Sequence, residues 1–203
     1  MHELERIVLH NWGVLASQDI DLRGSVAILG PTGAGKSTII DALQVIITGA
    51  NTNFYDLNKS TGGRNERRIR DYCLGYDSHI STDGPARDSA DSLIALVFRD
   101  RQSGMPITIG LILSAYMDEA KHDLRARFVA PGFGLRLDQL IELREDNRRV
   151  MPVAARLLDR LKMLCPQLRN HLSTAIGYVD DYLLAMRPRS VAPDSKQVLR
   201  NFK

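Results

Sequence analysis

The chain has 203 residues, of which 44% are apolar and 25% charged, so it is long enough to bury a sizeable core and has an ordinary globular composition. Its formal net charge of +3 is too small to indicate a nucleic-acid partner by itself. No apolar run approaches the ~20 residues that cross a bilayer, and the N-terminus lacks signal-peptide features, which favours a cytoplasmic location without a membrane partner. Two cysteines without metal-ligand spacing, Cys73 and Cys165, predict reduced, buried thiols.

The first predicted elements are two strands, over residues 4–10 and 15–22, joined at Asn11-Trp12-Gly13. A tight turn at residues 23–25 then leads into an apolar run, Val26 to Leu29, which predicts a buried strand. Two strands therefore precede the motif that follows. Simple nucleoside kinases and small GTPases usually place this motif after their first strand.

The motif is the phosphate-loop pattern GxxxxGK[ST], lying between the predicted strand and an amphipathic helix. Its glycines allow the backbone to bring successive N–H groups toward a polyphosphate, and the helix N-terminus adds positive partial charge. Lys36 can reach the β- and γ-phosphates, and the Ser37 hydroxyl is the expected Mg²⁺ ligand. We therefore expect ATP and Mg²⁺ to bind at Gly30, Pro31, Thr32, Gly33, Ala34, Gly35, Lys36, Ser37 and Thr38.

The helix after Lys36 is apolar nearly all round, as expected for a helix buried against a sheet, and Gly49 is its predicted C-terminal glycine. A polar loop over residues 50–65 and a short helix over 66–74 follow. Between residues 59 and 70, a single acid, Glu66, accompanies five basic residues: Lys59, Arg64, Arg67, Arg68 and Arg70. They predict either a solvated helix end or phosphate contacts, to DNA or to the bound nucleotide.

After a second polar loop, three strands at residues 92–99, 106–114 and 123–130 predict an antiparallel meander beside the nucleotide-binding core. Beyond Pro131 the sequence predicts helices at residues 153–164, 168–186 and 195–202.

Hydrolysis of ATP requires an acidic element that handles Mg²⁺ and water, in addition to the phosphate loop. The best candidate is the run that ends in Asp180-Asp181, but the residues around it favour a helix with exposed acids. No catalytic residue is therefore predicted. We expect this chain alone to bind ATP without hydrolysing it.

The first 49 residues resemble the N-terminal head segment of the structural-maintenance-of-chromosomes (SMC) proteins and their relatives. Those proteins open with an L-x-x-I-x-L-x-N-[FW] strand and continue to a GPxGxGKS loop and an IIDA-type helix. The matching positions are Leu4, Ile7, Leu9, Asn11 and Trp12, then Gly30 to Ser37, then Ile39 to Ala42. Residues 54–56 and 68–75 are similar to the MukB-like branch, and more narrowly to the JetC group of Wadjet anti-plasmid systems or to MksB proteins.

The resemblance implies an α/β P-loop NTPase, specifically an ABC-type ATPase head lobe with a mixed sheet, an antiparallel β-meander and a C-terminal helical part. Residues 1–203 would form the N-terminal half of the head: 1–49 with the Walker A loop, 50–130 with the basic segment and meander, and 131–203 mostly helical. The implied nucleotide-contacting arginine downstream of the loop corresponds most closely to Arg64.

The resemblance also implies partners. They are the C-terminal half of the same head, which supplies the Walker B carboxylates; a second head, engaged on ATP binding; kleisin and kleisin-associated subunits; and double-stranded DNA. The location would be the cytoplasm, at the nucleoid, and the role chromosome condensation, loop extrusion or anti-plasmid defence. The alternative is a self-contained P-loop enzyme, such as a small-molecule kinase.

Overall fold

The computed structural model describes residues 1–57, 67–76, 84–146 and 148–187. Its centre is a six-stranded sheet with the strand order β2-β1-β3-β4-β5-β8, in which every paired neighbour is antiparallel. The strands are β1 (His2–Trp12), β2 (Leu15–Asp21), β3 (Ser89–Asp100), β4 (Pro106–Tyr116), β5 (Asp123–Pro131) and β8 (Arg169–Asn170). The predicted N-terminal strand pair and the predicted meander are both confirmed.

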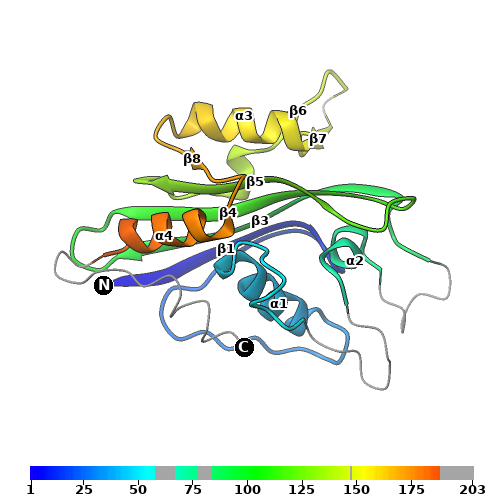
Figure 1. The fold of residues 1–203 in the computed structure, drawn as a ribbon, viewed down its shortest axis with the longest axis horizontal. Coiled ribbons are helices and arrows are strands. Elements are labelled where there is room, and N and C mark those ends of the chain that lie inside the picture. Colours follow the sequence, from blue (N-terminus) through cyan, green and yellow to red (C-terminus); the bar gives the residue numbers. More distant parts are fainter. Residues whose placement is uncertain (58–66, 77–83, 147, 188–203) are drawn as a thin grey trace.

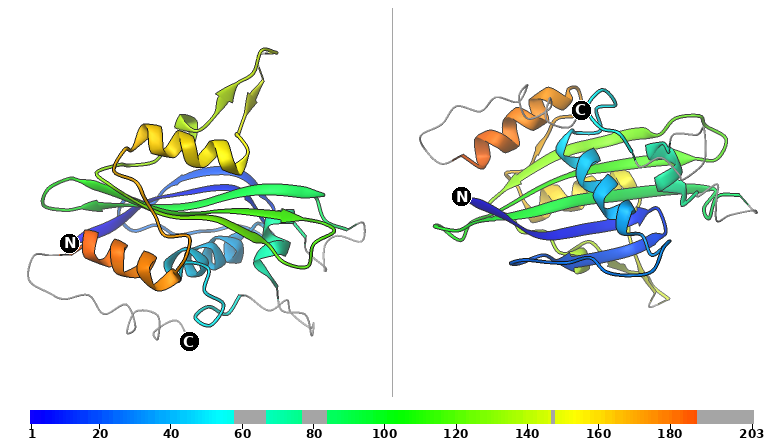
Figure 2. Two further views of the ribbon diagram at one scale, coloured as in Figure 1. Left: turned by 45° about the horizontal axis from the view of Figure 1, so that its top comes forward. Right: turned by 90° about the horizontal axis from the view of Figure 1, so that it is seen from below.

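The helices form a layer on each face of this sheet (Figures 1 and 2). One face carries α1 (Lys36–Ile47), α2 (Ile69–Leu74) and α4 (Ala175–Ala185). The other carries the turn η1 (Leu137–Gln139), the small hairpin β6 (Glu142–Leu143) and β7 (Arg149–Val150), and α3 (Ala154–Leu164). No helix among the described residues is long and apolar enough to cross a membrane.

The hairpin and the meander share one sheet, rather than lying beside each other, because β1 pairs with β3. Three consecutive residues of β1, Ile7, Val8 and Leu9, are buried, which requires cover on both faces of the strand. Ile7 and Leu9 pack under α1, whereas Val8 packs under α3. β1 is therefore a central strand between two apolar layers.

β4 contributes side chains to the apolar layers on both faces of the sheet and is buried along most of its length. Ile109 and Leu111 belong to the cluster beneath α1, and Ile112 to the cluster beneath α3, as the alternation of a strand requires. On the α3 side, Gly110 lies directly opposite Phe128 of β5. A Cβ atom at residue 110 would lie 2.5 Å from the Phe128 ring, so the glycine provides the space that the ring fills.

The C-terminal end of α1 is held by side chains from α4 and β5. The Tyr182 hydroxyl donates to the carbonyl of Ile47 (3.0 Å), and Arg127 Nε donates to the carbonyl of Gly49 (2.6 Å). Burial lowers the pKa of Arg127. Gly49 has the left-handed φ of 63° typical of the residue after a helix, as predicted. The first bond satisfies the Ile47 carbonyl, one of those that a helix end leaves without internal partners, and the second ties the residue after the C-cap to β5.

Of the three helices predicted beyond Pro131, one is confirmed, one needs correction and one lies outside the described residues. The helix predicted over 168–186 begins only at Ala175, because Arg169 and Asn170 pair with β5 and the Thr174 hydroxyl caps the helix by accepting from the N–H of Gly177 (3.0 Å). The helix predicted over 195–202 lies outside the described residues. The helix predicted over 153–164 is confirmed as α3.

The strand predicted at Val26–Leu29 is wrong. Residues 22–30 contain no strand, and Val26 and Leu29 are 48% and 88% exposed. A strand forms only with a hydrogen-bonding neighbour, and no strand of the described sheet pairs with this run. The mixed sheet that the resemblance implies is not found among the described residues, since all described strand pairs are antiparallel.

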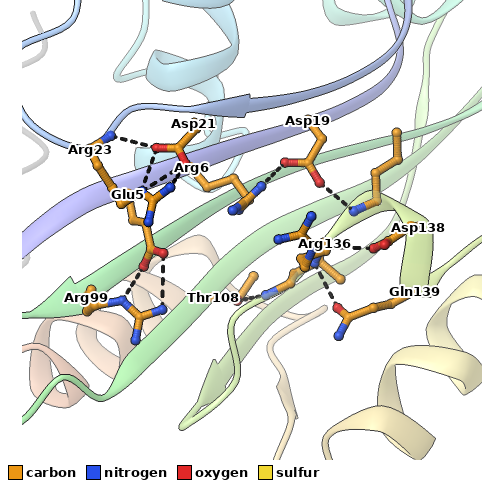
Figure 3. A network of polar contacts seen from close by, with 12 residues as sticks. Glu5, Arg6, Asp19, Asp21, Arg23, Arg99, Thr108, Arg136, Asp138 and Gln139 are labelled. Carbon is orange, nitrogen blue, oxygen red and sulfur yellow. Dashed lines mark hydrogen bonds and ion pairs between the residues drawn. The ribbon is translucent and has the colours of Figure 1, made fainter.

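A network of polar contacts lies at the end of β2, where the connection to α1 begins (Figure 3). Arg99 binds the Glu5 carboxylate through Nε (2.5 Å) and through a second guanidinium nitrogen (3.1 Å), and the backbone N–H of Leu22 donates to the Glu5 carbonyl (2.7 Å). Asp21 binds the Arg23 side chain at the start of the connection. The network joins β1 to β3 close to the end of β2, where the connection to the phosphate loop begins.

Candidate phosphate-binding site

The phosphate loop ends at Gly35, whose left-handed φ of 87° directs the chain into α1. Gly33 is also left-handed, with φ 84°. Such angles are accessible to glycine at little cost, which explains its presence at these two positions of the pattern. No side chain caps the N-terminus of α1, so its first-turn N–H groups are available to an anion.

The Lys36 side chain folds back over the phosphate loop. Its Nζ atom donates to the carbonyls of Gly30 and Pro31, at 2.7 Å each. The ammonium group therefore already lies over the loop that would surround a polyphosphate. A bound triphosphate would replace neutral carbonyls with charged oxygens, which form stronger hydrogen bonds to a cation.

The first turns of α1 are anchored by an aromatic pair. Trp12 and Tyr72 stack with ring centroids 4.7 Å apart and planes within 11°. Trp12 Nε1 donates to the carbonyl of Thr38 (2.9 Å), and the Tyr72 hydroxyl donates to Asp41, a carboxylate that is only 1% exposed. β1 and α2 thus hold the helix on which the phosphate loop is built.

The turn between β1 and β2 packs against the loop at close range. A Cβ atom at Gly13 would lie 2.7 Å from Cγ2 of Thr38, and one at Gly35 would lie 3.3 Å from side-chain atoms of Val14 and Leu15. Backbone contact also reaches α2, because the Gly13 N–H donates to the Tyr72 carbonyl (2.7 Å). The two N-terminal strands therefore position the loop directly.

The predicted basic cluster does not act as one group. Lys59 and Arg64 lie outside the described residues. Arg70 donates to the carbonyls of Tyr116 (3.3 Å) and Met117 (2.6 Å), and so fastens α2 to the turn after β4. Arg68 is exposed, whereas the Arg67 guanidinium lies 5.9 Å from the centroid of the Tyr72 ring.

The acidic candidate of the sequence, Asp180-Asp181, lies within α4, which confirms the helical interpretation. Asp180 is exposed. Asp181, by contrast, is mostly buried and binds Arg169 (2.7 Å) and His171 (2.6 Å), so the expectation that both acids are exposed is wrong for this residue. The contacts fasten α4 to the segment before it.

The residues at the loop fit a nucleotide with Mg²⁺ better than a free metal ion. The described residues contain no group of three or more His, Cys, Asp or Glu side chains that could hold a metal. Ser37 offers one half-exposed hydroxyl at the start of α1. Mg²⁺ binds through few protein ligands, together with phosphate oxygens and water, and such a site suits it.

A family model described as the P-loop containing region of an AAA domain matches residues 4–63. The match includes both strands that precede the loop, the loop itself and α1. No curated protein matches the chain at a significant level. The chain therefore contains the phosphate-loop region of a P-loop NTPase, a class that generally binds a nucleotide with Mg²⁺.

Two residues that support this site, Asp41 and Tyr72, were not predicted from the sequence. Asp41 carried a signal, because a carboxylate within an otherwise apolar helix must find a partner when it is buried. Tyr72 carried none, because its sequence separation from Asp41 gives no indication that the two side chains meet.

Proposed function

We propose that this chain is the ATP-binding N-terminal segment of an SMC-like ATPase head, which acts on DNA through ATP-driven engagement of two heads. The observation that carries the proposal is a phosphate loop that follows an antiparallel hairpin, β1 and β2. This hairpin belongs to the same sheet as the meander β3-β4-β5. The assignment to the MukB-like branch, with its JetC and MksB groups, depends on the resemblance of residues 54–56 and 68–75 alone.

The residues that carry the resemblance have physical roles around the loop, which supports the proposal. Ile7 and Leu9 fill the core beneath α1. The Asn11 side chain donates to the Asp91 carbonyl (2.9 Å), and this bond accompanies an unusual positive φ of 49° at Asn11. Trp12 anchors α1 at Thr38. The motif is thus explained as the support of a nucleotide-binding helix.

An exposed apolar surface supports a role for the C-terminal half of the head as a partner. Val26 and Ile28 border a hollow of about 400 Å³ between the loop connection and α1, together with Ile7, Ile39 and Leu43. Ile40 on the same helix is 49% exposed. Strand-forming residues without a neighbouring strand are suited to pairing with an added strand. We propose that the second half of the head supplies that strand and the Walker B carboxylates.

The further partners follow from the same proposal. They are a second head, joined when ATP binds, kleisin and kleisin-associated subunits, and duplex DNA at the nucleoid. Arg67 and Arg68 are the described residues proposed to contact DNA, with Lys59 and Arg64 from the same segment. Because Arg70 is occupied by carbonyl groups, we assign it a structural role.

This chain alone is expected to show negligible ATP turnover, since the acidic run at Asp180-Asp181 does not form a Walker B strand: both acids lie in α4, Asp180 is exposed, and Asp181 binds Arg169 and His171. Adding a polypeptide that supplies the proposed second half should produce turnover. The measurement is phosphate release for the chain, for the added polypeptide and for their mixture.

The matched control is a mixture in which the chain carries Lys36→Ala, which should remain inactive. Robust turnover by the chain alone, abolished by Lys36→Ala, would instead establish the alternative, a self-contained P-loop enzyme.

Charge reversal of Arg64, Arg67 and Arg68 to Glu is expected to weaken duplex DNA binding by the assembled ATPase. Basic side chains that neutralise phosphates release counterions, so the dependence of log K on log salt should flatten by about one unit for each lost contact. The measurement is DNA affinity by fluorescence anisotropy over a range of salt concentrations.

The matched control replaces three other arginines with Glu, so the change in charge is the same. These lie on the opposite face of the sheet: Arg136, Arg149 and Arg156. An equal loss of affinity in both triple variants would indicate a non-specific charge effect. Unchanged affinity and slope in the first variant would place the DNA site elsewhere.

A further inference from the structure

Arg67, Tyr72 and Asp41 form a continuous chain of contacts between the basic segment and the nucleotide helix. The guanidinium of Arg67 lies over the Tyr72 ring, and one of its nitrogens is 3.4 Å from the Tyr72 hydroxyl oxygen. That hydroxyl donates to Asp41, which lies in the second turn of α1. Burial, followed by the bond to Asp41, raises the pKa of Tyr72 well above its usual value, so the hydroxyl remains a donor.

The same ring is joined to the first turn of α1 by a second route. Trp12 stacks on Tyr72 and donates to the carbonyl of Thr38, two residues beyond Lys36. Trp12 is fully buried, so neither ring can shift without displacing the other. A movement of Tyr72 would therefore be felt at both the first and the second turn of the helix that begins at Lys36.

A small cavity of about 20 Å³ lies where these elements meet, lined by Gly13, Thr38, Arg67, Asp71 and Tyr72 among others. It has room for about one water molecule and not for a nucleobase. Arg67 and Thr38, which lies in the first turn of α1, thus line one small cavity that is too small for a ligand to separate them. The contact between the two sites is made by packed side chains.

We propose that Tyr72 is a positioning residue that couples a phosphate group bound at Arg67 to the triphosphate bound at the loop, so that the two ligands bind cooperatively. The proposal rests on the proposed function, which supplies duplex DNA as the source of the phosphate. A phosphate bound at Arg67 holds this arginine over the Tyr72 ring and so supports the contacts that fix the first two turns of α1. The second ligand then binds to a helix whose position is already supported, which favours both.

The sign of the coupling distinguishes this proposal from simple electrostatics. Two polyanions bound close together repel one another, and that repulsion weakens as salt is added. Coupling through shared ordering is positive and depends little on salt. We expect DNA at saturation to raise the affinity for ATP·Mg²⁺ by about fivefold or more, within the range usual for coupled sites.

The chain contains a built-in probe for the test, because Trp12 is its only tryptophan. Its indole bonds to α1 and stacks on Tyr72, so its fluorescence should respond to ATP binding at the loop. The experiment titrates ATP·Mg²⁺ with and without a saturating duplex DNA, at two salt concentrations. DNA binding itself is measured in parallel by anisotropy.

Three variants separate the outcomes. Tyr72→Phe keeps the ring but removes the hydroxyl, and should bring the effect of DNA on ATP affinity close to onefold. Arg67→Gln should do the same, whereas Arg68→Gln removes an adjacent exposed charge and should weaken DNA binding while keeping the coupling at saturation. The two arginine variants keep the test valid if Tyr72→Phe folds poorly.

Unchanged coupling in both Tyr72→Phe and Arg67→Gln, or negative coupling that disappears with salt, would overturn the proposal. A loss of ATP affinity in Arg67→Gln without DNA would also overturn it, because Arg67 would then contact the nucleotide itself. Failure of the proposed function has a different signature: the parent chain would bind ATP, but neither it nor the assembled ATPase would bind DNA.

Discussion

Replacing Lys36 by Ala is expected to lower the affinity for ATP·Mg²⁺ by roughly 10- to 100-fold. The ammonium group is the one side-chain cation held over the described loop, where it donates to the carbonyls of Gly30 and Pro31. A hydrogen bond to a charged group contributes about 1.5–3 kcal/mol, which corresponds to that change in affinity. Isothermal titration calorimetry at matched Mg²⁺ measures it.

The control for this change is Lys162→Ala, which removes a lysine from α3 on the opposite face of the sheet. Its affinity should equal that of the parent chain. Because Lys36 is only half buried and contacts an exposed loop, its loss should leave the thermal midpoint nearly unchanged. Equal ATP affinity in the parent chain and in Lys36→Ala would refute the assignment of the loop as a phosphate site.

Replacing Phe128 by Ala is expected to destabilise the fold by about 3–5 kcal/mol. The ring is fully buried and fills the space above Gly110 on the α3 side of the sheet. Its removal leaves a cavity that the neighbouring strands can fill only in part. Urea denaturation followed by circular dichroism measures the free energy of unfolding.

Gly110→Ala provides the matched test of this packing. Alone it should cost about 1–3 kcal/mol, since its Cβ would lie 2.5 Å from the Phe128 ring and 2.9 Å from the backbone carbonyl of Ile94. With Phe128→Ala, the same substitution should cost clearly less, because the ring is gone. Additive costs would show that the two residues do not share one packing site.

Several elements could be predicted from the sequence because their signals are local. The phosphate loop, the start of α1 at Lys36 and the meander strands depend on glycine positions, apolar alternation and turn residues that lie close together in the chain. Two glycines of the loop pattern, Gly33 and Gly35, adopt left-handed backbone angles that favour glycine at these positions.

Other features depended on which segments meet. Val26 to Leu29 has the composition of a strand, yet pairs with nothing described, because strand formation requires a neighbour and not composition alone. Arg169 and Asn170 lie within a helical pattern but pair with β5 instead. In both cases a tertiary contact, present or absent, overrode the local preference.

The sequence by itself determined that this protein has the phosphate-loop region of a P-loop NTPase, because the pattern that defines the loop is a contiguous run of residues. Only the tertiary structure decided what holds the loop in place. Trp12, Asp41 and Tyr72 come from three separate segments, and their stacking and hydrogen bonds arise when β1, α1 and α2 pack together. The tertiary structure also gave the basic residues different roles. Arg70 donates to a carbonyl in the turn after β4, whereas Arg67 lies over an aromatic ring, although the two are only three residues apart.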